Sequence, residues 1–146
     1  MSALATDLRL DVTLAPAEAD LCAVETGLAA YNAERRGPYR TVAIFLRDGE
    51  GRVRGGAIGR VLATDFGLAM LHVDADLRGQ GHGRALLHAA ERLAAAEGCR
   101  RVLLDTSDFQ APDFYRRAGY DVIGRIDDYI LGHGRTWFRK TLPEAA

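Results

Sequence analysis

The chain has 146 residues, of which 48% are hydrophobic and 27% charged, and its formal net charge is −1 at pH 7. This length fits a single domain over residues 1–146 with a sizeable core, and the near-neutral charge gives no general attraction to nucleic acid. No apolar run approaches the roughly 20 residues of a membrane span, and the first residues lack the basic and apolar parts of a signal peptide. We therefore expect a cytoplasmic protein with no nucleic-acid or membrane partner.

The two cysteines, Cys22 and Cys99, stand alone in the sequence. Neither has a second cysteine or a histidine at the spacing of metal ligands. We interpret both as unpaired thiols, and we expect no metal site.

The first half of the chain predicts a strand, a helix and then three more strands. Residues 8–12 alternate between apolar and polar, as a strand does. The following helix begins at Pro16, places Leu21, Val24, Leu28 and Tyr31 on one face, and ends near residues 36–38. Three apolar or β-branched runs separated by short turns come next: residues 41–47, 53–62 and 66–73.

The second half predicts two helices and three strands. A long helix runs from about Gly81 to Glu97 and stops at Gly98, and residues 101–105 form a buried strand. A helix beginning at Pro112 is followed by two strands, at residues 120–126 and 136–141. The resulting order, β-α-β-β-β-α-β-α-β-β, predicts an α+β fold with a mixed, mostly antiparallel central sheet flanked by helices.

Three alternating glycines separate the strand that ends at Val73 from the long helix. Gly79, Gly81 and Gly83 allow successive backbone N–H groups to face one side without interference from a Cβ atom. The N-terminal end of the helix dipole adds positive potential at the same place. This segment therefore predicts an anion-binding loop of the kind that holds a pyrophosphate.

The spacing of this loop bears on which phosphate compound it binds. A nucleoside-triphosphate loop ends in Gly-Lys-Ser/Thr, and the segment has no such lysine. The dinucleotide pattern G-x-G-x-x-G also fails, because its sixth position is Arg84 counted from Gly79 and Leu86 counted from Gly81. Asp105, after an apolar run, does imitate the ribose-binding acid of dinucleotide folds. A dinucleotide-binding module therefore stays open as an alternative that NADH binding would identify.

Two motifs resemble those of a known family. The pattern Arg-x-x-Gly-x-Gly at Arg78, Gly81 and Gly83 resembles the acyl-coenzyme A signature of the GNAT superfamily of N-acetyltransferases. Residues 111–120 resemble that family's A-x-x-F-Y-x-x-x-G-F/Y helix, in the expected order along the chain. The resemblance implies one GNAT-like N-acyltransferase domain, an enzyme of class EC 2.3.1 that uses acetyl-CoA as cosubstrate.

The resemblance also implies where acetyl-CoA binds. The strand ending at Val73 diverges from the strand ending at Asp105, and backbone groups near Leu71 and Val73 bind the pantetheine arm between them. Around the pyrophosphate we expect the residues of the glycine loop: Arg78, Gly79, Gln80, Gly81, His82, Gly83 and Arg84.

Tyr115 is the candidate catalytic acid, because a phenol can donate a proton to the departing coenzyme A thiolate. We expect Phe114 and Ala118 to pack on the sheet and Tyr115, rotated by about 100°, to face the cleft. The sequence does not single out one base for deprotonating the acceptor amine. The candidates are His72, Asp74 and a relayed water. Asp108 stands where many family members have asparagine.

Two segments are candidates for binding the acceptor. In the family, the turn after the first helix borders the acceptor cleft, and here it carries Tyr31 and Glu34. Asp127, Asp128 and His133 lie in a D-D-x-x-x-G-H loop that resembles one in a bacterial GNAT subgroup, and paired carboxylates favour a cationic acceptor. A small-molecule amine is therefore our first choice of acceptor. A protein N-terminus or lysine, or a non-catalytic acyl-CoA sensor, stays open, and the family allows a homodimer.

Overall fold

We analysed the fold in a computed structural model of the chain, which describes residues 7–144. The chain falls into two compact units, one ending at Arg35 and the other beginning at Arg36, and we describe each by itself. No helix within the described residues is long and apolar enough to cross a membrane. Cys22 is exposed and Cys99 buried, and both are free thiols.

The first unit contains most of α1, which spans Glu18–Arg36 and ends where the sequence predicts. Its apolar positions lie at helical spacing, but none of its residues is buried. The predicted strand at residues 8–12 is wrong, because Leu8, Leu10 and Val12 are 86–98% exposed and form no strand. Alternation favours a strand only where a neighbouring strand supplies hydrogen bonds and a surface to cover, and no described strand pairs with this segment.

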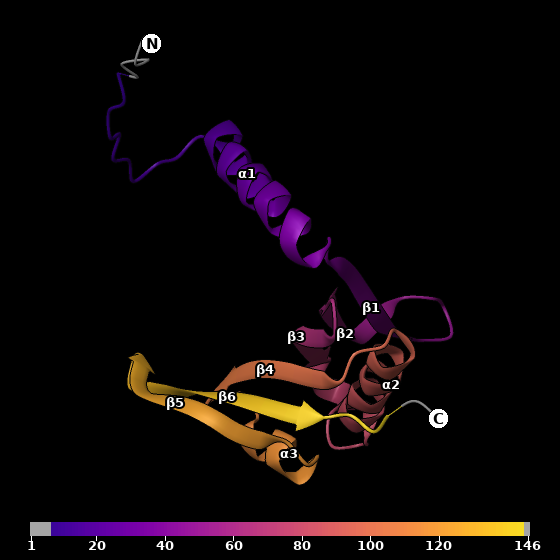
Figure 1. The fold of residues 1–146 in the computed structure, drawn as a ribbon. Coiled ribbons are helices and arrows are strands. Elements are labelled where there is room, and N and C mark those ends of the chain that lie inside the picture. Colours follow the sequence, from indigo (N-terminus) through magenta and orange to yellow (C-terminus); the bar gives the residue numbers. More distant parts are fainter. Residues whose placement is uncertain (1–6, 145–146) are drawn as a thin grey trace. The chain divides into compact units, whose positions relative to one another are not determined.

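The second unit is built on one six-stranded sheet (Figure 1). Its strands, in the sheet order β1-β2-β3-β4-β6-β5, are β1 Arg40–Arg47, β2 Val53–Leu62, β3 Asp65–Val73, β4 Arg101–Ser107, β6 His133–Thr141 and β5 Asp121–Ile130. Every neighbouring pair is antiparallel except β3 and β4, which run parallel. The mixed, mostly antiparallel α+β sheet that the sequence predicts is thus confirmed, without the first strand.

Helix α2, His82–Ala96, packs across β1, β2 and β3 (Figure 1). Gly81 and Gly98, just outside its two ends, have φ of +86° and +85°, a left-handed conformation that a side chain would strain. The buried face is apolar and consists of Leu86, Leu87, Ala90 and Ala94. The predicted helix and its glycine stop are therefore confirmed.

The hairpin of β5 and β6 is longer than predicted. Asp127 and Asp128 belong to β5 and His133 begins β6, so the expected loop over these residues is mostly strand. The turn lies at Leu131 and Gly132, whose φ values of 49° and 80° are those of a tight two-residue hairpin turn. Sequence alternation did not reveal this extension because the pairing is irregular between Ile126 and Ile130.

Candidate active site

A cavity of about 630 Å³ opens where β3 and β4 separate. The two strands pair only from Asp65 opposite Arg101 to Gly67 opposite Leu103, and β3 bulges at Ala69 in its pairing with β2. The predicted divergence of the two strands is therefore present. Residues from β3, β4, the following loop and the short helix α3, Pro112–Arg117, line the cavity: Leu68–Val73, Arg78, Leu104–Thr106, Phe109–Ala111, Phe114 and Tyr115.

Tyr115 is the buried residue of α3, with 8% of its surface exposed. Its ring packs edge-on against Tyr120 and lies 5.9 Å from the ring of Phe138, and this burial raises the pKa of Tyr115 to about 12. No hydrogen bond ties its hydroxyl to the described part of the chain, where every fully buried polar side-chain atom has a partner. The hydroxyl is consequently open to the cavity.

The predicted division of the faces of α3 is only partly right. Phe114 and Ala118 pack against the core, as expected, but Phe114 lines the cavity beside Tyr115. The cavity extends around the side of α3, so two residues about 100° apart on the helix both reach it.

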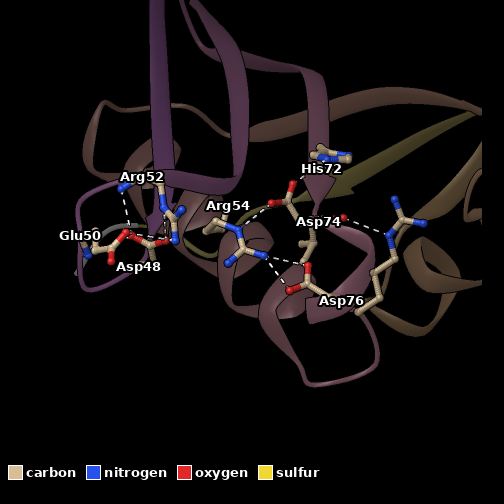
Figure 2. Close-up of polar contacts among 9 residues, drawn as sticks. Asp48, Glu50, Arg52, Arg54, His72, Asp74 and Asp76 are labelled. Atoms are coloured by element: carbon tan, nitrogen blue, oxygen red, sulfur yellow. Dashed lines mark hydrogen bonds and ion pairs between the residues drawn. The ribbon is translucent and has the colours of Figure 1, made fainter.

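His72, at the end of β3, lines the same cavity and lies next to a carboxylate (Figure 2). Its Nε2 is 3.3 Å from Oδ1 of Asp74. The other oxygen of Asp74 accepts a hydrogen bond of 2.7 Å from Nε of Arg54 on β2. This bond is the main cause that holds the pKa of Asp74 below its usual range. Asp74 is therefore an anion that can orient the imidazole of His72.

The glycine loop leaves backbone open to a ligand. Gly79 and Gly81 have φ of +75° and +86°, and nothing lies within 4 Å of where a Cβ would be. Arg78 lines the cavity and donates from Nε to the Val73 carbonyl over 2.9 Å, so this bond does not use the two terminal guanidinium nitrogens. Gln80 donates to the Asp76 carbonyl.

The remaining residues predicted for this loop lie in the first turn of α2: His82, Gly83 and Arg84. A Cβ at Gly83 would make ordinary contact with the Phe114 ring, at 3.8 Å, so this glycine is not needed for space. Backbone donors, an arginine and a helix N-terminus together suit a pyrophosphate.

The acceptor candidates on the β5–β6 hairpin are not equivalent. Arg125 donates to both oxygens of Asp108, at 2.8 and 2.9 Å, and to Asp127 at 2.8 Å. The bond from Arg125 is the main cause that lowers the pKa of Asp108 to about 2. Asp127 thus shares the charge of Arg125 with Asp108, whereas Asp128 forms no ion pair with a described residue and is the better candidate of the two for a cation. The ring of His133 packs edge-on against the ring of Phe109, 5.1 Å away; Phe109 lines the cavity, but His133 does not.

Tyr31 and Glu34 belong to the unit that ends at Arg35. There the Arg35 guanidinium lies 3.6 Å from the centre of the Tyr31 ring and 3.7 Å from the Glu34 carboxylate. Their contact with an acceptor stays a prediction.

Sequence reasoning missed several residues in or behind the cavity lining, among them Arg54, Phe109 and Gln110. Gln110 holds the loop after β4, because its Oε1 accepts hydrogen bonds from the Ser107 N–H at 2.8 Å and from the Thr106 hydroxyl. Arg54 had no sufficient signal, since regular pairing of β2 and β3 from their turn puts residue 54 opposite residue 73, and only the bulge at Ala69 brings it beside Asp74. Phe109 had no signal either, because it lies in a loop.

Three comparisons with known proteins agree with this geometry. Residues 12–120 match the model of the acetyltransferase (GNAT) family. The chain is 39% identical over 96 residues to blasticidin-S acetyltransferase of Streptomyces morookaense, covering 65% of this chain and 71% of that protein. It is 33% identical over 129 residues to an acetyltransferase of Agrobacterium fabrum, covering 87% of this chain and 93% of that protein.

The fold has solved counterparts as well. A crystal structure of an acetyltransferase from Bacillus cereus superimposes with a TM-score of 0.78 at 30% identity, covering 90% of this chain and 98% of that one. On the family match and these relatives, the chain belongs to the GNAT family of acetyltransferases.

Proposed function

We propose that this protein, as one domain, transfers an acetyl group from acetyl-CoA to the primary amine of a small molecule, directly within a ternary complex. One observation carries the proposal: a single cavity is lined by a phenol, an imidazole and an arginine, on Tyr115, His72 and Arg78. Direct transfer needs an acid, a base and an anion-binding group around one space. The relative named for blasticidin S supports a small-molecule acceptor.

The residues of the site fit acetyl-CoA. The loop from Arg78 to Arg84 would hold the pyrophosphate through open backbone N–H groups and arginine. Leu71 and Val73 on the free side of β3 would lie along the pantetheine arm, although the Val73 carbonyl already accepts from Arg78. The backbone N–H groups of β3 are then the better partners. When bound, acetyl-CoA supplies the acyl group and a thiol leaving group.

The acid and the base have separate tasks. His72, oriented by the Asp74 carboxylate, takes the proton that the acceptor ammonium must lose before its nitrogen can attack. Tyr115 donates a hydrogen bond or proton to the sulfur as the carbon–sulfur bond breaks. Because burial raises the pKa of Tyr115 to about 12, the phenol carries its proton at neutral pH. Asp128 on the hairpin would attract a cationic acceptor.

Calorimetric titration with acetyl-CoA tests the proposal first, with coenzyme A and NADH as comparisons. We expect saturable binding of acetyl-CoA and of coenzyme A, and no binding of NADH. In a screen of amines, the enzyme should then release one coenzyme A thiol for each molecule of amine that it acetylates. Preference for NADH would overturn the proposal in favour of a dinucleotide module, and acetylation of peptides but of no small amine would overturn the choice of acceptor. Binding without thiol release from any acceptor would indicate a sensor.

A further inference from the structure

Arg54 is a half-buried arginine that lies behind the candidate base (Figure 2). It comes second in β2, where Gly55 pairs with Val73, and its carbonyl accepts a hydrogen bond from the Asp74 N–H at 2.9 Å. Backbone pairing alone therefore places Arg54 beside Asp74, independently of any side-chain contact. Its side chain is 25% exposed, so it does not extend freely into solvent.

The guanidinium of Arg54 is divided between two carboxylates. Nε donates to Oδ2 of Asp74 at 2.7 Å, and Nη2 donates to both oxygens of Asp76 at 2.8 and 2.7 Å (Figure 2). A planar fork of donors can hold two partners in fixed directions, which an ammonium cannot do. One side chain thus joins the end of β3 to the short 3-10 turn Ala75–Leu77 that leads into the glycine loop.

The bond to Asp74 has a consequence for His72. With Oδ2 fixed by Arg54, the remaining oxygen of Asp74 is the one that meets His72 Nε2. An imidazole whose Nε2–H is held by a carboxylate presents Nδ1 as the proton acceptor. Arg54 also keeps Asp74 ionised, since its hydrogen bond is the largest cause of the lowered pKa of that carboxyl.

The bond to Asp76 has a consequence for the loop. Asp76 lies two residues before Arg78, and its carbonyl accepts a hydrogen bond from Gln80, so the position of Asp76 sets the start of the loop. Two carboxylates beside a loop that binds an anion oppose that binding by charge repulsion. Arg54 offsets one of the two negative charges and holds both carboxylates turned toward β2.

We propose that Arg54 is a positioning residue for acetyl transfer, which orients His72 through Asp74 and sets the entrance of the coenzyme A loop through Asp76. This inference deepens the proposed function and rests on it. It gives Arg54 two separable effects, one on the pH dependence of turnover and one on the affinity for coenzyme A.

The test compares Arg54→Gln with Arg52→Gln as a matched control. Arg52 makes the same kind of ion pair with Asp48, Nε to Oδ2 at 2.9 Å, but in the β1–β2 turn and away from the cavity lining (Figure 2). We expect Arg54→Gln to lower kcat about tenfold, by analogy with the lower end of the loss seen when the outer partner of a metal-bound histidine is removed, and to weaken coenzyme A binding in calorimetry. Arg52→Gln should change neither.

The pH profile separates positioning from mere stability. The groups that line the cavity around His72 are Arg78, Asp105 and Tyr115, with Asp74 behind the ring. Removing the charge of Arg54 strengthens the negative field of Asp74, which favours the protonated imidazole. The acidic limb of the kcat profile should therefore move to higher pH. A lowered melting temperature and a uniform loss of activity, with the limb unmoved, would show a structural role and overturn the inference.

Two further variants make the result specific. If Arg54 acts through Asp74, combining Arg54→Gln with Asp74→Asn should lower kcat no further than Asp74→Asn alone. Arg54→Lys should recover stability but not the pH profile, because an ammonium cannot hold both carboxylates. Additive losses would overturn the inference. Unchanged turnover in His72→Gln would instead refute His72 as the base, and so the proposed function on which the inference rests.

Discussion

Replacing Tyr115 by phenylalanine removes one hydroxyl from the cavity and nothing from the core. The ring keeps its contacts with Tyr120 and Phe138, and the hydroxyl has no partner in the described chain to leave unpaired. We therefore expect the free energy of unfolding to change by less than about 1 kcal/mol. Because burial raises the pKa of the Tyr115 phenol to about 12, the phenol is protonated at pH 8, and the substitution removes its acid form.

Loss of a positioned general acid lowers turnover by about 10²- to 10⁴-fold, so we expect kcat of Tyr115→Phe to fall at least about a hundredfold. Affinity for acetyl-CoA should stay within a factor of two or so, because the ring that lines the cavity is unchanged. Tyr120→Phe is the control, since its hydroxyl donates to Glu91 at 3.0 Å and its loss should cost stability but not turnover. Thiol-release kinetics at saturating acceptor measure kcat for both variants, and calorimetry measures their affinity for acetyl-CoA. Turnover of Tyr115→Phe equal to that of wild type would refute the acid role.

Three other perturbations have definite expected outcomes. Gly81→Ala and Gly98→Ala, both at φ near +85°, should each lower the free energy of unfolding by about 1 kcal/mol in denaturant titrations, but only the former should weaken coenzyme A binding; equal affinities would place the pyrophosphate elsewhere. The folded pKa of Asp108, about 2, lies below the ordinary 3.8, so its contribution to stability is complete above pH 4 and lost as the pH falls toward 2. Acid unfolding of Asp108→Asn should lack that component, and identical acid curves would contradict the ion pair with Arg125. Asp128→Asn should raise KM for a cationic acceptor up to about fivefold, and a constant KM for every amine would remove Asp128 from the acceptor site.

The sequence predicts best where one residue type has one physical use. Glycines at 79 and 81 are required by positive φ, and the glycine after α2 ends that helix, so loop and helix were both predictable. The strand at residues 8–12 failed because alternation reports only a preference for one covered face and says nothing of a neighbour. Arg54 escaped notice for a related reason: its partners are fixed by strand register, which no local pattern displays.

The single lysine among the 19 basic residues has a structural role in the second unit. Lys140 on β6 donates to both oxygens of Glu91 on α2, at 3.1 and 3.0 Å, and to the Ala118 carbonyl at the end of α3, at 2.9 Å. The Tyr120 hydroxyl donates to the same glutamate. A compact ammonium serves three acceptors that converge on one point, whereas a planar guanidinium spreads its donors apart. Lys140 thereby joins α2, which begins after the glycine loop, to the C-terminal end of α3, which carries Tyr115.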